Sequence, residues 1–132
     1  PPRAREARER VRQVNEYALW CMERDLWDEA QLHLERALAV DSLAASLHNN
    51  MGIVYERLGR QEEALGEYRR ARELRPRKAY AANLHLLQER IRAAEESVVP
   101  DSLVLRHEDA AAEPDSAAAP ADSAATLPTR GD

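Results

Sequence analysis

The sequence predicts an all-α fold, a stack of about two and a half helical hairpins that ends in a single helix and an extended acidic tail. The chain repeats itself at an offset of 34 residues, which is typical of stacked helical hairpins. One copy carries Gly52, Tyr55, Gly59, Ala64, Tyr68, Ala71 and Pro76, and the other carries Ala18, Cys21, Asp25, Ala30, Leu34, Ala37 and Ser42. Small residues recur because the two helices of a hairpin cross closely at those positions.

The first hairpin is expected to contain helices over residues 3–24 and 27–40. The first of these is rich in Ala, Arg and Glu, which are good helix formers. Its apolar stripe, expected to be buried, is Val14, Tyr17, Ala18 and Cys21, at the i, i+3, i+4, i+7 spacing of one helix face. Asp25 stands between the two helices and should end the first one, and Asp41 and Ser42 form the next break.

The second hairpin is expected over residues 43–58 and 61–74, joined through Gly59. Pro76 ends its second helix because proline has no N–H to continue the backbone hydrogen bonds. A fifth helix over residues 78–96 has no predicted partner helix, and a lone final helix is typical of the closing end of a repeat array.

The repeated residues resemble the tetratricopeptide repeat, a family of stacked helical hairpins with small, aromatic and proline residues at these spacings. The resemblance is fullest for residues 45–78, weaker for 11–44 and partial for 79–96. It implies a right-handed stack and a scaffold that holds partner proteins. We therefore expect a basic N-terminal helical extension (1–10), the repeat domain (11–96) and an Ala/Pro/Asp/Ser-rich acidic tail (97–132).

Charge and composition narrow the function classes. Residues 1–96 hold equal numbers of basic and acidic residues, so the net charge of −5 lies entirely in residues 97–132. A neutral body with an acidic tail argues against nucleic-acid binding. The single cysteine excludes an internal disulfide, and no apolar run approaches the roughly 20 residues of a membrane-spanning helix, so direct membrane contact is not expected.

The start of the chain leaves its compartment open. Pro1 is compatible with a trimmed initiator Met, which would fit a cytoplasmic protein, and with a processed precursor, which would fit a periplasmic or membrane-associated one. Many Ala and Arg residues and few Lys residues suggest a bacterial source of high GC content.

The resemblance implies that the first helix of each hairpin lines a concave groove. At the 34-residue offset, Asn15, Asn49 and Asn83 share one groove position. Four residues further on, the equivalent residues are Leu19, Ile53 and Leu87, with Asn50 beside the strip and Glu56 and Arg90 one turn beyond it. Residues i and i+4 share a helix face, so an amide row beside an apolar row is suited to an extended peptide. The alternatives are that the Asn side chains bridge neighbouring repeats and that the apolar row packs internally.

A chaperone-binding carboxylate clamp, known in some members of the family, is not expected. Those members use Lys, Asn and Arg side chains to grip acidic C-termini. The corresponding residues here are Asn15, Leu19, Asn50, Tyr80 and Leu84. Only Asn50 agrees with that pattern, and none of the five can pair a carboxylate with a positive charge.

We expect no enzymatic activity, no cofactor and no metal. Cys21 is interpreted as a buried packing residue, and the four His residues lack zinc-ligand spacing. Trp27, at a helix start, is a possible exposed anchor for a partner protein. The apolar run Leu103, Val104 and Leu105 is a possible docking segment, or it packs on the last helix.

Two functions are compatible with these features. The first is a non-catalytic interaction module that binds an extended segment of a partner protein in its groove. The second is a structural accessory subunit of a larger, possibly membrane-associated complex, which contacts its neighbours through the tail and the convex face.

Overall fold

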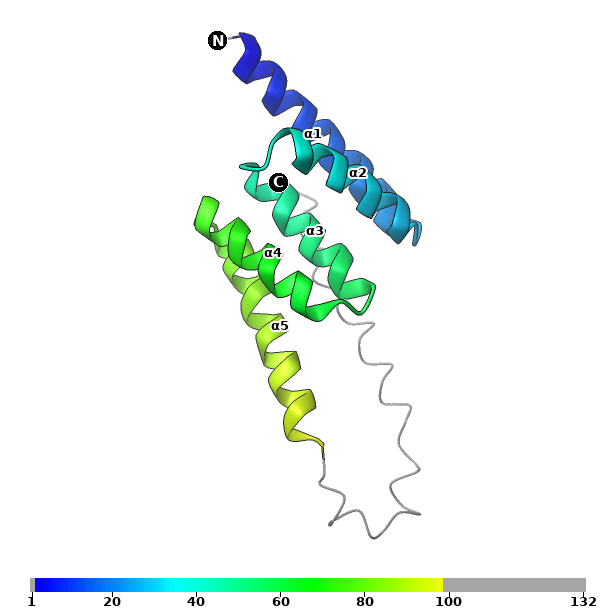
Figure 1. Cartoon of the computed structure of the whole chain (residues 1–132), viewed down its shortest axis with the longest axis vertical. Helices are drawn as coiled ribbons and strands as arrows, with labels where there is room; N and C mark the ends of the chain where they lie inside the picture. Colours follow the sequence, from blue (N-terminus) through cyan, green and yellow to red (C-terminus); the bar gives the residue numbers. More distant parts are fainter. Residues whose placement is uncertain (1, 99–132) are drawn as a thin grey trace.

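The computed structural model describes residues 2–98, and every regular element in that part of the chain is an α-helix. The helices are α1 (Pro2–Glu23), α2 (Trp27–Val40), α3 (Ala45–Arg57), α4 (Gln61–Leu74) and α5 (Lys78–Glu96). In Figure 1, α1 and α2 lie at one end of the molecule, α5 runs toward the other end, and α3 and α4 lie between them. The all-α expectation is confirmed.

Short turns join the helices, and the two hairpin turns are built alike. Asp25 and Gly59, which are 34 residues apart, both have a positive φ, of 60° and 80°. In each turn a backbone N–H reaches back five residues, from Leu26 to the Cys21 oxygen at 2.9 Å and from Arg60 to the Tyr55 oxygen at 2.8 Å. This is the hydrogen bond that closes a helix through a left-handed residue, so Asp25 performs the task usually given to glycine.

The helices share one apolar core in which small residues allow close crossing. Ala18, Ala30 and Ala64 are fully buried. The helices approach closely at Gly52, where an added Cβ would lie 2.6 Å from the ring of Tyr68. Real Cβ atoms do not come that close to another heavy atom, so α3 and α4 cross at a distance that only glycine allows.

The two ends of the stack differ from its middle. The N-terminal part of α1 extends past α2 (Figure 1). At the other end, Leu86 of α5 occupies the position equivalent to Gly52 yet is 42% exposed, because no helix follows α5 within residues 2–98.

No helix between residues 2 and 98 is long and apolar enough to cross a membrane. Residues 99–132, which include most of the expected acidic tail and the possible docking segment Leu103 to Leu105, lie outside the described residues.

Candidate protein-interaction surfaces

The asparagines at the predicted groove position are joined across the first helices of the stack. Asn50 Nδ2 donates to Asn15 Oδ1 at 2.8 Å, and Asn83 Nδ2 donates to Asn49 Oδ1 at 2.9 Å. Asn15 Nδ2 donates to Ser46 Oγ at 2.7 Å, so α1 and α3 are bridged twice. We call Asn15, Asn49, Asn50 and Asn83 the amide ladder. The structure brings the predicted residues together, and it does so through hydrogen bonds between repeats.

Burial explains why the ladder bonds internally. Asn49 is 1% exposed, and Asn50 and Asn83 are 5% exposed. An amide buried without a partner would cost about 1–3 kcal/mol, so each of these side chains must find a hydrogen bond inside the protein. The geometry therefore corresponds to the inter-repeat bridging that the sequence left open as an alternative.

The apolar row next to the ladder is part of the core. Ile53 is 4% exposed and Leu87 is fully buried, while Leu19 on α1 is half-buried and packs against the same cluster. Of the predicted groove residues, only Asn15 and Leu19 are partly exposed.

A second polar connection joins α3, α4 and α5, and the sequence analysis did not identify its pairing. Glu56 accepts a hydrogen bond from the hydroxyl of Tyr68 at 2.8 Å and also pairs with Arg90 of α5. The Glu56 side chain is 7% exposed. Burial, with the Glu56 carboxylate as a further cause, raises the pKa of Tyr68 well above its usual range, so the phenol stays protonated and donates. Glu56 and Arg90 are 34 residues apart, a spacing that marks them as neighbours in the stack.

The two tryptophans differ in exposure. Trp27 is half-buried, packs against the core and lies under the guanidinium of Arg57, 5.0 Å from the ring centre. Trp20 is 44% exposed. Trp27 is therefore less exposed than the sequence suggested, because it begins α2 beside Arg57 of α3, and its role as a possible anchor stays a prediction.

Tyr17 also departs from the sequence-based expectation. It was assigned to the buried stripe of α1, yet it is 39% exposed. Its ring stacks on Trp20 with centroids 5.8 Å apart, and the ring of His33 from α2 approaches it edge-on at 4.7 Å. The guanidinium of Arg24 lies 4.1 Å from the centre of the Trp20 ring. These four residues form an ordered aromatic patch on the outside of the first hairpin.

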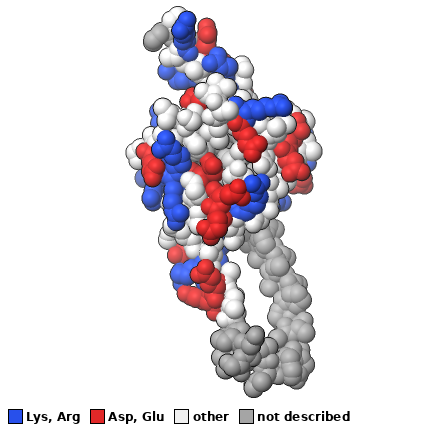
Figure 2. Space-filling view, viewed as in Figure 1, with Lys and Arg blue, Asp and Glu red and all other residues white. Residues whose placement is uncertain are grey.

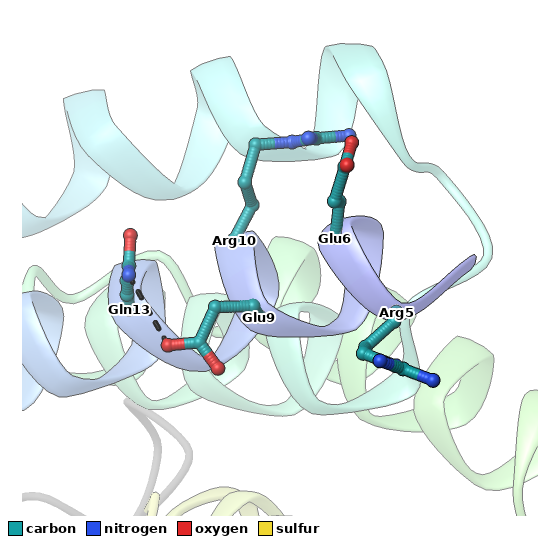
Figure 3. A pocket seen from close by; sticks show the side chains of 5 residues that line it. All are labelled: Arg5, Glu6, Glu9, Arg10 and Gln13. Carbon is teal, nitrogen blue, oxygen red and sulfur yellow. Dashed lines mark hydrogen bonds between the residues drawn. The ribbon is translucent and has the colours of Figure 1, made fainter. Parts of the chain in front are cut away.

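A shallow hollow continues along the N-terminal half of α1 (Figure 3). It is lined by Arg5, Glu6, Glu9, Arg10 and Gln13. Gln13 Nε2 donates to Glu9 at 3.1 Å, and the same carboxylate pairs with Arg12 at 2.8 Å. Figure 2 shows basic and acidic side chains interspersed over the visible face. The hollow therefore has no dominant charge that would select an anion or a cation.

Cys21 and His48 are engaged in packing and hydrogen bonding. Cys21 is fully buried. His48 Nδ1 contacts Glu67 at 2.7 Å, and its Nε2 contacts the Ser42 carbonyl at 2.8 Å. The hydrogen bond to Glu67 is the main cause that raises the pKa of His48. This part of the chain holds no group of three or more His, Cys, Asp or Glu residues suited to a metal ion.

These features define a protein of the helical-repeat class. Residues 45–78 match the family model described as Tetratricopeptide repeat, and the chain therefore contains a tetratricopeptide repeat formed by α3, α4 and the turn that leads to α5. Tetratricopeptide repeats are generally non-enzymatic interaction modules that bind protein partners. No curated protein matches the chain.

Proposed function

We propose that this protein is a non-catalytic interaction module that binds an extended segment of a partner protein along one face of α1, α3 and α5. We call this surface, which carries the amide ladder and Leu19, the inner face. The observation that carries the proposal is the amide ladder, with its bonds of 2.8 Å from Asn50 to Asn15 and 2.9 Å from Asn83 to Asn49. The ladder holds the three helices in register, so the inner face is preorganised. Binding of a partner segment then costs less conformational entropy of the repeat domain.

Because the ladder amides bond to one another, we expect a partner to contact mainly the residues of the inner face that are partly exposed. Leu19 can receive an apolar side chain, and Asn15 keeps a second acceptor lone pair and a second donor hydrogen. Ser46, half-buried beside Asn15, adds a hydroxyl. In an extended segment the side chains alternate between two sides and the backbone N–H and C=O groups stay exposed. One side chain of the segment can therefore pack on Leu19 while its backbone groups bond to the amide and hydroxyl groups beside it.

The charge pattern supports a protein partner rather than a nucleic acid. Residues 1–96 are electrically neutral, and the exposed basic groups are interspersed with acidic ones (Figure 2). The positions of the chaperone clamp include Tyr80 and Leu84, which are 6% and 1% exposed. Neither residue provides the cation needed for a partner's terminal carboxylate, so we propose a partner without that requirement.

A second candidate function is a structural accessory subunit of a larger complex. It is favoured by apolar side chains on the outside of the first hairpin and the connection that follows it. Leu32 is 39% exposed, Val40 77% and Leu43 66%. Such a subunit would contact its neighbours through the outer surface and through residues 97–132.

Site-specific photo-crosslinking tests the two functions against each other. A benzophenone amino acid placed at Leu19 probes the inner face of the full chain, and the same group at Leu32 probes the outer face as a matched control. The chain is irradiated in an extract of its native cells, and mass spectrometry identifies the crosslinked peptides. We expect one recurrent partner segment from Leu19 and none from Leu32.

The reverse pattern would support the accessory subunit and overturn the groove proposal. Deleting residues 97–132 should leave the Leu19 crosslink intact, whereas an accessory subunit held by its tail would lose its partners. A crosslink from Leu19 to residues 103–105 of the same chain would assign the inner face to its own segment and would also contradict the proposal.

A further inference from the structure

The outward face of α1 occupies a position in the stack that is covered on α3. Tyr17 and Trp20 correspond, at the 34-residue offset, to Met51 and Val54. Met51 is 1% exposed and Val54 is fully buried, whereas Tyr17 and Trp20 are 39% and 44% exposed. The same helix face is therefore closed in the second hairpin and open in the first.

The element that covers α3 is α2. Met51 and Val54 belong to one core cluster with Leu34, which is fully buried, and with Leu38 and Trp27, which are half-buried. These three residues lie on one side of α2, because their spacings of four, seven and eleven residues each return to the same helix face. Within residues 2–98 no helix takes the place of α2 on the outward face of α1.

We call Gln13, Tyr17, Trp20 and Arg24 the α1 end face. Its aromatic rings are held in place before anything binds, by the stacking of Tyr17 on Trp20, the edge contact of His33 and the position of Arg24 over Trp20. Ordered Trp and Tyr side chains supply a large contact area with little loss of side-chain entropy, and both are enriched among residues that dominate binding energy.

We propose that the α1 end face binds an amphipathic helix of a partner protein, which packs on Tyr17 and Trp20 as α2 packs on α3. The internal α2–α3 interface is the template, since the end face is the same surface one repeat earlier. The bound helix should present apolar residues to the two rings at i, i+7 and i+11, the spacing of Trp27, Leu34 and Leu38 in α2. Its ends should be polar, because Gln13 and Arg24 stand at the two ends of the aromatic pair.

A second copy of this chain fits the end face less well. Two α1 helices packed antiparallel about Tyr17 and Trp20 would bring Arg24 of one copy near Gln13 of the other, and each aromatic pair would meet the other aromatic pair instead of an aliphatic stripe. The free face of α5 offers one large exposed apolar residue, Leu86, between the small Ala82 and the charged Glu89. Neither surface reproduces the apolar stripe of α2, so the occupant is a partner helix.

This inference is independent of the groove proposal. Leu19 and Trp20 are adjacent in α1, and consecutive helical residues point in directions about 100° apart. Leu19 packs against the core beside the inner face, while Trp20 stands on the outer surface. A variant of one residue can therefore be tested without changing the other surface.

The test uses the full chain, labelled with nitrogen-15, and a synthetic peptide as the probe. The peptide has the sequence of residues 27–40 with Trp27→Leu, and a crosslink between the positions of Leu32 and Arg36 holds it helical on the side away from the stripe. The indole N–H signals of Trp20 and Trp27 are followed during titration. We expect the Trp20 signal to shift in a saturable way and the Trp27 signal to stay in place.

Matched variants locate the contact. The double variant Tyr17→Ala, Trp20→Ala should weaken peptide binding by at least about tenfold, as expected for a pair of aromatic anchors. Leu32→Ala changes a residue of similar exposure, 39%, on another surface and should leave the affinity unchanged. A peptide with Leu34→Asp and Leu38→Asp should not bind.

Three results would overturn the proposal. One is the absence of any Trp20 shift up to the solubility limit of the peptide. Another is a set of shifts that centres on Trp27 or on α5. The third is a Trp20 signal that changes when the protein alone is diluted, with loss of self-association in Trp20→Glu, because a second copy would then be the occupant. None of these results affects the Leu19 crosslink, so the two proposals can fail separately.

Discussion

The hairpins α1–α2 and α3–α4 follow the same backbone plan, but they differ in the pair of residues at which their two helices cross. In the first hairpin this pair of positions holds Ala18 and Leu34, and in the second it holds Gly52 and Tyr68. All four residues belong to the interior of the stack. A small residue faces a medium one in the first hairpin, and the smallest faces an aromatic ring in the second. The crossing therefore conserves combined volume rather than residue type.

A second pair of equivalent positions changes from apolar to polar. Met22 and Leu34 in the first hairpin correspond to Glu56 and Tyr68 in the second. The Glu56 carboxylate accepts from the Tyr68 hydroxyl and pairs with Arg90 of α5. In the first hairpin the following helix is α3, and the residue equivalent to Arg90 is Glu56, which is acidic. The polar pair is thus found where the following helix supplies a cation.

Position in the stack accounts for the rest of the contrast. Nine residues of the 13-residue α3 are buried, against three of the 22 in α1. α3 has neighbouring helices on both sides and α1 has them on one side, so residues at equivalent sequence positions differ in how far they are buried. An end helix exposes what a middle helix buries.

The largest expected effect comes from breaking the Gly52–Tyr68 crossing. Gly52→Ala should lower the free energy of unfolding by about 2 kcal/mol, because the new Cβ would meet the fully buried ring of Tyr68. The energetic cost of this overpacking is larger than the gain in helix propensity from Gly to Ala. Chemical denaturation followed by circular dichroism measures the change. Gly66→Ala is the matched control: it is a helical glycine with nothing within 4 Å of the new Cβ, so it should stabilise by about 0.5–1 kcal/mol.

The same crossing can be converted to the chemistry of the first hairpin. Gly52→Ala combined with Tyr68→Leu recreates the pair Ala18 and Leu34, so the double variant should be more stable than the sum of the two single losses. Strict additivity of the two losses, or a stable Gly52→Ala single variant, would contradict the account of complementary volumes.

The next effect tests the polar pair of the second hairpin. Tyr68→Phe keeps the ring and removes the hydroxyl that donates to Glu56 at 2.8 Å, so the free energy of unfolding should fall by about 1–2 kcal/mol. Tyr55→Phe is the control, since its ring meets the guanidinium of Arg60 at 4.6 Å, and it should change stability by less than about 0.5 kcal/mol. Equal losses from the two substitutions would show that the Glu56 contact does not stabilise the hairpin.

The sequence predicted the helices well where local residues decide them. α2, α4 and α5 begin and end at the predicted residues, and α3 begins two residues later than expected, at Ala45. The turns depend on Asp25 and Gly59 and on the proline after α4, and each acts on its own neighbours along the chain. A 34-residue offset also placed Asn15, Asn49 and Asn83 at one position of the repeat, although the bond to Asn15 comes from Asn50, the residue beside that row.

Exposure was predicted less well because it depends on distant parts of the stack. The pattern of α1 alone assigns Tyr17 to a buried stripe, since in a repeated array another helix would cover it. Trp20 and Trp27 are chemically identical, and only the position of α3 decides that Trp27 is covered. Likewise the Asn spacing shows that side chains align, but not whether they bond to a partner or to one another.

The turns provide a smaller test of the equivalence between hairpins. Gly59→Ala should cost about 1 kcal/mol, because φ at this residue is 80° and the space around it is open, so only backbone strain is added. Asp25 already tolerates a φ of 60° as an L-residue, and Asp25→Gly should change stability by less than about 0.5 kcal/mol. Thermal unfolding of the two variants measures the difference. A larger loss for Asp25→Gly than for Gly59→Ala would show that the Asp25 side chain, not the backbone, maintains its turn.

The smallest effect is a pH dependence confined to the second hairpin. His48 takes the position that Val14 holds in the first hairpin. Its ring contacts Glu67 and the Ser42 carbonyl, and the positive charge of Arg70 opposes its protonation. Its pKa is raised in the folded protein, chiefly by the hydrogen bond to Glu67. A raised pKa means that the folded state binds the proton more tightly, so this stabilisation is complete below the unfolded pKa of about 6.5 and is lost as the pH rises through the folded pKa.

Wild type should therefore exceed Glu67→Gln in free energy of unfolding by about 0.5 kcal/mol more at pH 5.5 than at pH 8.5. Urea denaturation at the two pH values measures this difference, in which the other titrating groups cancel. His33→Gln is the control, because His33 pairs with Glu29 within the exposed surface of α2 and joins no second helix through that pair. An equal difference between wild type and Glu67→Gln at the two pH values would show that the Glu67 contact causes no pH dependence and would remove this contrast between the two repeats.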